Sequence, residues 1–288
     1  MVKEVNIIKA SGEIEPFSEI KLRRSLERIN TQPELITEII YHIRSELKEG
    51  MKTSAIYDHA FSLLKSKEYF TAGRYSIKKA LLELGPSGYP FEKIVAQILK
   101  SAGYEVETNK ILEGHCISHE VDVVATKNSQ HLLVECKFHN RAGYKTDAKV
   151  ALYINARFWD IKRLSSGKSN HREEGKLEAW LVTNTKLSLD AINYCNCAGI
   201  SAIGWSYPSK GKNLQYLLEE SGLLPITCLI SLTKAQKNQL LGQGLVVCRD
   251  LVDQKEILQS IGLSATKQIR VLKEVGELCQ YEKNSLRL

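Results

Sequence analysis

The stretch HEVDVVATKNSQHLLVECKF, residues 119–138, carries the strongest structural signal in the chain. Two apolar runs flank the polar segment KNSQ, a pattern that predicts two strands joined by a short turn. If that turn is symmetric, Asp122 lies directly across from Glu135. Glu135 and Lys137 are two residues apart, so strand alternation points both side chains to one face. The sequence therefore predicts that Asp122, Glu135 and Lys137 converge at one end of a hairpin.

This grouping suits the hydrolysis of a phosphodiester. Two carboxylates can hold a hard divalent cation, Mg²⁺ or Mn²⁺, while a nearby ammonium orients water and neutralises charge on the phosphate. Charges at the ends of apolar strands are costly unless they serve a purpose. The alternative is a solvent-exposed hairpin face with a cross-strand ion pair. The residues alone support both interpretations equally.

The segments around the hairpin alternate between helical and strand patterns. FEKIVAQILKSAGYEVETN, residues 91–109, predicts an amphipathic helix that ends near Gly103 and turns into a strand. A second helix is predicted in TDAKVALYINARFWDIKRL, residues 146–164, where the aromatic residues are expected to pack in the core and Arg157 to meet a DNA backbone. AWLVTN, SLDAINYCNCAG and ISAIGW then predict strand, helix and strand. We expect an α/β domain over residues 88–225, with a mixed sheet flanked by helices.

Residues 88–208 resemble the Mrr-like restriction endonucleases of the PD-(D/E)xK superfamily. The matching segments are GYPFEKIVAQILKSAGYEVE, HEVDVVAT and LLVECK, in the family order of an acidic helix, a strand with Asp and a strand with Glu-x-Lys. The resemblance implies a restriction-endonuclease-like fold in which Asp122 and Glu135 bind the metal and Lys137 is the catalytic lysine. It also makes Glu92 an additional acidic site residue, although a solvated helix-surface position explains Glu92 equally well. The implied substrate is DNA, and such nucleases often act as homodimers.

The N-terminal segment, residues 1–85, is predicted to be small and mainly helical. It opens with a strand-like piece whose Ser11-Gly12 pair marks a hairpin turn, and Ser18 is placed to cap the helix that follows.

This segment resembles an ATP cone, through IIKASGEIEPFSEIKLRRSL at residues 7–26. Lys9, Gly12, Phe17 and Lys21 fit the family pattern, whereas Ala10 and Ser11 replace its usual Arg and Asp. The resemblance implies that Lys9 and Lys21 contact the phosphates of an ATP or dATP effector. The alternative is a module that keeps the fold and no longer binds nucleotide.

The C-terminal segment, residues 231–288, has a purely helical pattern, and LLPITCLI before it is expected to be a linker or edge segment. Two turns with Gly244 and Gly262 lie between helical runs and resemble tandem helix-hairpin-helix turns, whose backbone N–H groups can bind phosphate. A plain helical bundle is the alternative.

Composition narrows the classes of protein. The 288 residues carry a net charge of +7, and ten Lys or Arg face four Asp or Glu between Lys137 and Lys176, which is compatible with a polyanionic partner. No apolar run approaches the roughly 20 residues that span a bilayer, and the charged N-terminus does not resemble a signal peptide. We therefore expect a cytoplasmic protein with no membrane contact. Seven cysteines without regular spacing do not describe a disulfide framework, and Cys195 and Cys197 are expected to fill space rather than bind metal.

The leading hypothesis is a metal-dependent DNA endonuclease regulated by ATP or dATP. The first alternative is a nucleotide-responsive DNA-binding regulator that does not cut, and a second is a structural adaptor.

Overall fold

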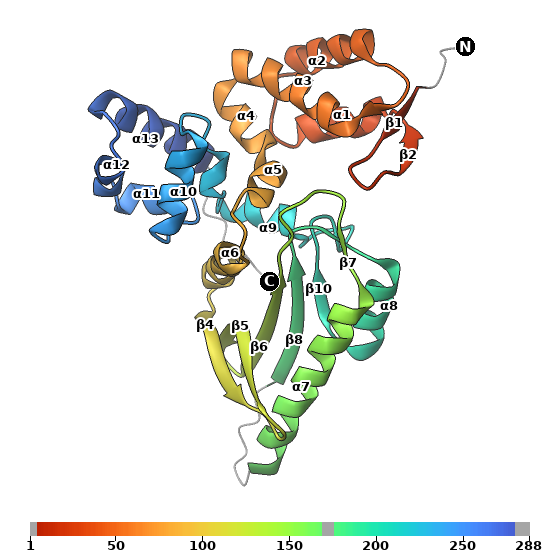
Figure 1. The fold of residues 1–288 in the computed structure, drawn as a ribbon, viewed down its shortest axis with the longest axis vertical. Helices are drawn as coiled ribbons and strands as arrows, with labels where there is room; N and C mark the ends of the chain where they lie inside the picture. The colour runs from red at the N-terminus through yellow and green to blue at the C-terminus, as the bar shows by residue number, and fades with distance from the viewer. Residues whose placement is uncertain (1–4, 169–175, 280–288) are drawn as a thin grey trace.

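The computed structural model describes residues 5–168 and 176–279 of the chain. Helices and strands form three groups, which Figure 1 shows as an N-terminal unit at the top, a sheet with long helices below it, and a set of C-terminal helices at the left. The architecture is mixed α/β, as the sequence predicts.

The N-terminal unit contains a three-stranded sheet and five helices. Strands β1 and β2 form the predicted antiparallel hairpin, in which Gly12 takes a positive φ of 84° that favours glycine. Ser18 caps the first helix by accepting a hydrogen bond from the backbone N–H of Lys21. The elements are β1 (Asn6–Ile8), β2 (Ile14–Pro16), α1 (Glu19–Glu27), α2 (Pro33–Glu46), β3 (Met51–Lys52), α3 (Thr53–Lys67), α4 (Tyr69–Tyr75) and α5 (Ile77–Leu82).

A five-stranded sheet of order β10-β8-β6-β5-β4 forms the centre of the second group. Strands β4, β5 and β6 pair antiparallel, whereas β6, β8 and β10 pair parallel, which confirms the predicted mixed sheet. The elements are α6 (Tyr89–Ser101), β4 (Glu105–Glu113), β5 (Ser118–Lys127), β6 (Gln130–Lys137), α7 (Ala148–Lys168), β8 (Lys176–Thr183), α8 (Leu189–Ala198) and β10 (Ser201–Ile203), with a small separate pair β7 (Lys145–Thr146) and β9 (Lys186–Leu187).

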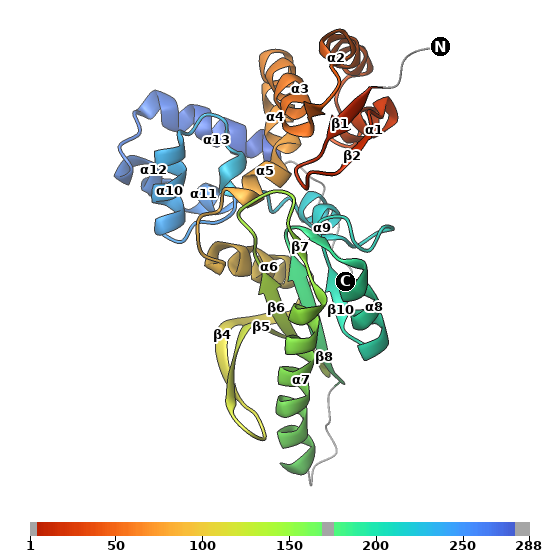
Figure 2. The same ribbon diagram turned by 45° about the vertical axis from the view of Figure 1, so that its right-hand side comes forward.

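Helices cover both faces of this sheet. Helix α6 packs on one face, over apolar residues that include Leu132 and Val134. Helices α7 and α8 lie on the other face, where α7 contacts Leu133 and the neighbouring apolar residues (Figures 1 and 2). The alternation of β6 therefore sends Glu135 to the α7 face.

Strand β5 changes its packing at Asp122. Val123 belongs to the α6 cluster, and strict alternation would put Val121 there too, yet Val121 packs in the α7 cluster. The ladder between β5 and β6 ends at the pair Val123–Val134, while Asn109, across from Asp122 on β4, has a positive φ of 52°. The sheet thus forks at Asp122, and in Figure 2 the β4–β5 hairpin curves away from the other strands.

The C-terminal helices share a core with the rest of the chain. One apolar cluster runs from Ile77 in α5 through α6 to Leu278 near the end of α13, so it crosses both predicted domain limits. The elements are α9 (Leu214–Ser221), η1 (Ile226–Cys228), α10 (Lys234–Gly242), α11 (Asp250–Asp253), α12 (Glu256–Ser260) and α13 (Ala265–Cys279).

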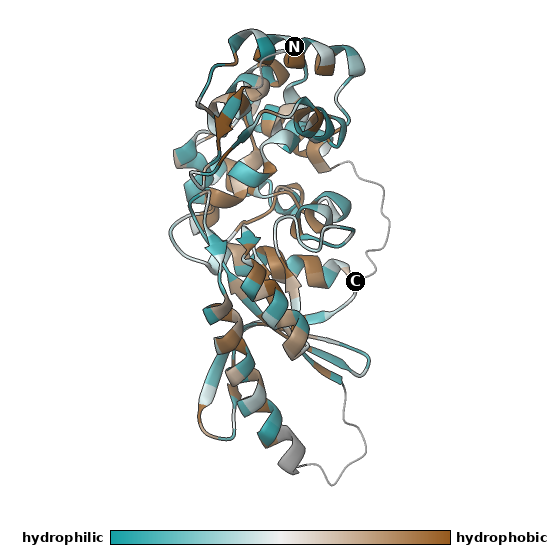
Figure 3. Ribbon diagram, turned by 90° about the vertical axis from the view of Figure 1, so that its right-hand side faces the viewer, coloured by the Kyte–Doolittle hydropathy of each residue, from teal (hydrophilic) through white to brown (hydrophobic). Residues whose placement is uncertain are grey.

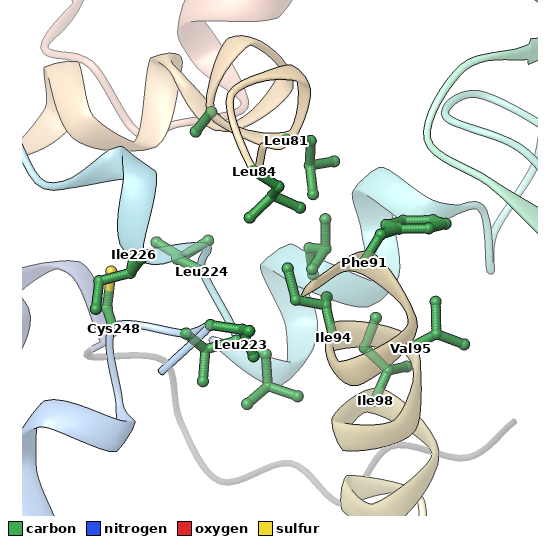
Figure 4. Close-up of a cluster of buried hydrophobic side chains, with 14 of the residues drawn as sticks. Leu81, Leu84, Phe91, Ile94, Val95, Ile98, Leu223, Leu224, Ile226 and Cys248 are labelled. Atoms are coloured by element: carbon green, nitrogen blue, oxygen red, sulfur yellow. The ribbon is translucent and has the colours of Figure 1, made fainter. Parts of the chain in front are cut away.

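The expectation of a linker at LLPITCLI is wrong. Leu224, Ile226 and Leu229 are fully buried, because this segment runs between α6 and the C-terminal helices and contributes side chains to their common core (Figure 4). The hydroxyl of Thr227 also donates to the carbonyl of Ala80 at 2.7 Å, which ties the segment to α5.

The turns at Gly244 and Gly262 do connect helices. The backbone N–H of Gly244 donates to the carbonyl of Leu241, and that of Gly262 donates to Gln259. Both N–H groups close the preceding helix, so they are not presented to a phosphate.

The helices of the N-terminal unit are amphipathic. At the top of Figure 3 they carry hydrophilic and hydrophobic residues on different sides, as expected for helices that pack on a core with one side only. Within the described residues, no helix has the length and apolar character that crossing a membrane requires.

Candidate active site

Asp122 and Glu135 lie side by side at the fork of the sheet. The β5–β6 ladder ends at Val123–Val134, so the predicted pair of Asp122 and Glu135 lies one step beyond its last pair, and the charge of Asp122 raises the pKa of Glu135. Oδ2 of Asp122 accepts a hydrogen bond of 2.7 Å from the backbone N–H of Cys136. The Asp122 side chain thus occupies the place where a paired strand would offer a carbonyl.

Glu135 is held by a cation from the neighbouring helix. Nη1 of Arg157, on α7, lies 2.5 Å from Oε2 of Glu135, and both side chains are largely buried. The prediction that Arg157 meets a DNA backbone is therefore wrong in this structure, since its charge points inward. Tyr153 and Trp159 also depart from the expectation of core packing, being 60% and 49% exposed.

Burial and neighbouring negative charges raise the pKa values of these carboxyl groups. The pKa of Glu135 is raised to about 7, mainly by burial and next by the charge of Asp122, while Arg157 and Lys137 pull it down. Burial likewise raises the pKa of Asp122, against the hydrogen bond from Cys136. Burial therefore favours the protonated form of both carboxyl groups.

Glu92 joins the same cluster from α6. It is half-buried in the first turn of the helix, and its Oε2 accepts a hydrogen bond of 3.2 Å from the side-chain amide of Asn109. Burial and the charge of Asp122 raise the pKa of Glu92. The structure thus brings Glu92 to Asp122, whereas a solvated surface position would not produce this interaction.

Lys137 completes the predicted set. Its side chain is exposed at the end of β6, and its positive charge lowers the pKa values of both Asp122 and Glu135. Asp122 therefore interacts electrostatically with each of the other three predicted site residues, Glu92, Glu135 and Lys137.

The residues present fit a hard divalent cation. Magnesium is usually bound by one or two carboxylates and several waters, rather than by a complete protein cage. Within residues 5–168 and 176–279, no group of three or more His, Cys, Asp or Glu side chains forms a ready-made metal site. Asp122 and Glu135 would hold the ion, because each has one oxygen engaged by Cys136 or Arg157 and a second oxygen available. The raised pKa values are the electrostatic deficit that a cation would offset.

Two residues of this site were not predicted as members. Arg157 shares a helical face with the buried Ile154 and Ile161, so a charge on that apolar face was a usable signal. Asn109 carries no such signal, because its role depends on the kink in β4 and on the position of α6.

The loop after Lys137 is fixed to the end of β8. The backbone N–H of His139 donates to the side chain of Asn184 at 2.9 Å, and Asn184 Nδ2 donates back to the His139 carbonyl at 2.7 Å. Nε2 of His139 lies 3.2 Å from the Thr146 hydroxyl. Burial and the charge of Lys137 lower the pKa of His139. These bonds hold the loop 138–146 beside the site.

The two lysines predicted to bind nucleotide meet at one carboxylate. Nζ of Lys9 lies 2.8 Å from Oε2 of Glu15, and Nζ of Lys21 lies 3.0 Å from the same oxygen. Glu13 adds a second partner for Lys9 at 3.3 Å, and the hydrogen bond from Lys9 lowers the pKa of Glu15. A phosphate group would therefore have to compete with Glu15 for these cations.

The N-terminal hairpin also touches the loop beside the candidate active site. A Cβ at Gly143 would stand 2.4 Å from the carbonyl oxygen of Ala10, so the two backbones are in direct contact. Nζ of Lys145 lies 3.4 Å from Oε1 of Glu13. The turn that carries Lys9 is thus in contact with the loop that follows Lys137.

Comparison with known proteins defines the N-terminal unit as an ATP cone domain, a nucleotide-binding type of module, over residues 5–83. Residues 224–279 match the C-terminal domain of AF1548-like proteins. A protein of Archaeoglobus fulgidus, described as uncharacterized, is 41% identical over 185 residues, which are 64% of this chain and 99% of that protein. The crystal structure of AF1548, titled a protein of unknown function, is 39% identical with a TM-score of 0.54, and the match covers 67% of this chain and 98% of the other. The chain belongs to the AF1548-like family and carries an ATP cone at its N-terminus.

Proposed function

We propose that this protein is a metal-dependent DNA endonuclease with a restriction-endonuclease-like core, and that ATP or dATP bound at the ATP cone regulates it. What carries the proposal is the set of three partly buried carboxyl groups, Asp122, Glu135 and Glu92, whose pKa values are all raised beside Lys137. Clusters of perturbed carboxyl groups are a property of functional sites.

Each residue has a defined part in the proposed reaction. Asp122 and Glu135 would hold Mg²⁺ or Mn²⁺, and such an ion supplies charge neutralisation on the phosphate and activation of the attacking water. Lys137, being exposed, can reach a phosphate oxygen and offset the negative charge that develops there. Arg157 fixes the orientation of Glu135, and Asn109 does the same for Glu92.

Regulation by nucleotide is supported by the contact between the two units. Phosphate binding at Lys9 and Lys21 would displace Glu15 and disturb the turn that lies against Gly143. The loop 138–146 begins directly after Lys137, so a shift of the turn can reach the site through backbone contact alone.

A second candidate function, a DNA-binding regulator that does not cut, is favoured by one observation. Arg157 already neutralises Glu135 at 2.5 Å, an ion pair that a protein without a metal would also keep. Such a regulator would bind DNA and give no metal-dependent product.

The first candidate, the endonuclease, would act as a homodimer, because cutting both strands of a duplex requires two sites.

The deciding experiment is cleavage of supercoiled plasmid with Mg²⁺ or Mn²⁺, with and without ATP. We expect nicking by the wild type and its loss in Asp122→Ala and Lys137→Ala, with DNA binding retained. Lys65→Ala, at an exposed lysine of α3, is the control and should cut normally. Equal nicking by wild type and by both site variants would refute the assignment, and binding without any product would favour the regulator.

A further inference from the structure

A large cleft lies beside the candidate active site, between the start of α6 and helix α10. Its volume is about 1050 Å³. The residues that give it chemical character are Tyr89, Lys93, Asn140, Lys234, Asn238 and Gly244. The cleft thus lies between the sheet domain and the C-terminal helices, and none of its lining residues has a part in the proposed reaction.

A second hollow continues the cleft toward the site. It has a volume of about 280 Å³, and it shares Pro86 and Asn140 with the large cleft. Its other walls include Phe138 and His139, which follow Lys137 directly. Gly88 closes the distance to the carboxylates, since a Cβ there would lie 3.0 Å from Oε1 of Glu92 and 3.8 Å from Phe138.

The cations that line the two hollows have no ion pair with a carboxylate among the described residues. Lys93, Lys234 and Arg141 line the two hollows, whereas Glu83 is the one acidic residue among the lining positions. Ion pairs elsewhere engage residues such as Arg157, but among the described residues none joins these three cations to a carboxylate. The two hollows are therefore complementary to a chain of phosphates.

Exposed aromatic rings stand beside these charges. Tyr89 is 48% exposed, and Nζ of Lys93 lies 4.6 Å from the centre of its ring. Tyr144 is 55% exposed and stacks on His139, with ring centres 5.7 Å apart. Gly244 leaves room for the Lys93 ammonium, because a Cβ there would come within 3.0 Å of it. Basic grooves with exposed rings are how proteins bind unpaired bases together with their backbone.

The size of the cleft favours a single strand of nucleic acid over a duplex. Its volume is close to the upper limit of the roughly 300–1,000 Å³ of ordinary ligand pockets, which suits a few nucleotides of one strand and not a duplex. We propose that this cleft binds a single strand of nucleic acid, with phosphates on Lys93, Lys234 and Arg141 and bases stacked on Tyr89 and Tyr144. That the bound strand runs toward Lys137 rests on the proposed function, whereas the binding of the strand in the cleft does not.

The test is fluorescence anisotropy with a labelled oligothymidine and a duplex of equal length, on the full chain in EDTA, where no cleavage can occur. We expect the single strand to bind more tightly than the duplex. The double variant Lys93→Gln/Lys234→Gln should reduce the slope of log affinity against log salt by about 0.7 for each lost contact. The control Lys48→Gln/Lys65→Gln makes the same change in net charge at exposed lysines outside the cleft, and its slope should match the wild type.

Substitutions of the ring test the stacking separately. Tyr89→Ala should weaken binding about fivefold or more, while Tyr89→Phe keeps the ring and should bind like the wild type. Tighter binding of the duplex, equal slopes in both lysine double variants, or unchanged affinity in Tyr89→Ala would each overturn the proposal.

The two proposals can fail independently. If the wild type and Asp122→Ala both bind the strand as described and no plasmid is ever cut, the cleft assignment stands and the nuclease assignment falls. If plasmid is cut but the cleft variants bind the strand like the wild type, the cleft assignment falls alone.

Discussion

Gly143 and Ala10 are in backbone contact, so close that a Cβ on Gly143 would meet the Ala10 carbonyl oxygen at 2.4 Å. Gly143 also has a positive φ of 91°, so both its conformation and its surroundings require glycine. Ala10 follows Lys9 in the ATP cone, and Gly143 belongs to the loop after Lys137. This contact is the most direct route by which a nucleotide could act on the candidate site.

Gly143→Ala tests that route. The new methyl group must push the Ala10 turn away from the loop, so we expect the effect of ATP on plasmid nicking to be lost while binding of a fluorescent ATP analogue persists. Gly211→Ala is a matched control, because Gly211 has a positive φ of 73° and no atom within 4 Å of its Cβ position. It shares the backbone strain, about 1–2 kcal/mol, without the clash. An ATP response that survives in Gly143→Ala would exclude this route.

The raised pKa of Glu135 predicts a pH dependence of stability in metal-free protein. Its pKa is about 7 in the folded state against an ordinary 4.5, so the folded state holds an extra proton between these values. Protonated Glu135 therefore contributes to the free energy of unfolding, fully below a pH of about 4.5, and this contribution is lost as the pH rises through 7. Gln at this position cannot ionise. The stability of Glu135→Gln relative to the wild type should therefore increase as the pH rises, by at most about 3 kcal/mol.

Urea denaturation in EDTA on either side of this pH window measures the difference. Glu15→Gln provides a control of opposite sign, because Lys9 lowers the pKa of Glu15. The stabilisation from Glu15 is present above its ordinary pKa and is lost as the pH falls. Parallel curves for wild type and Glu135→Gln would show that Glu135 ionises normally.

Metal binding should appear as thermal stabilisation. We expect Mg²⁺ to raise the melting temperature of the wild type more above pH 7 than below it, because metal binding requires ionised carboxylates. At a hundred times the dissociation constant the gain is about 2.7 kcal/mol. Asp122→Asn should abolish the shift, whereas Glu219→Gln, at another partly buried carboxyl whose pKa is raised by burial, should keep it. A shift that persists in Asp122→Asn would place the metal elsewhere.

The β5–β6 hairpin could be predicted because its determinants are local. Alternation, the polar turn and the two-residue spacing of Glu135 and Lys137 together fix which residues face one another, and the register from Val123 to Lys127 agrees. The Ser18 cap and the turn at Gly12 are likewise encoded within a few residues.

The fork at Asp122 and the partner of Glu135 could not be predicted in the same way. Arg157 is 22 residues from Glu135 in sequence, and their contact depends on how α7 crosses the sheet. The burial of LLPITCLI similarly depends on α5, α6 and α13 meeting around it. A short apolar run has the same sequence pattern in a buried segment as in a linker, so periodicity alone does not distinguish a buried segment from a linker.

Glu274 gives the clearest prediction of stability. This carboxylate of α13 is fully buried and accepts hydrogen bonds from the backbone N–H groups of Ile230 and Ser231 and from the Ser231 hydroxyl. Glu274→Ala would leave two partly buried N–H groups without their acceptor, a loss of at most about 1–3 kcal/mol each. Glu274→Gln keeps one acceptor oxygen and should lose less. Glu256→Ala, at an exposed position of α12, should change stability by no more than about 0.5 kcal/mol. Urea denaturation of the metal-free protein decides: a loss in Glu274→Ala no larger than in Glu256→Ala would mean that water replaces the carboxylate, and that the end of LLPITCLI is held by its apolar side chains alone.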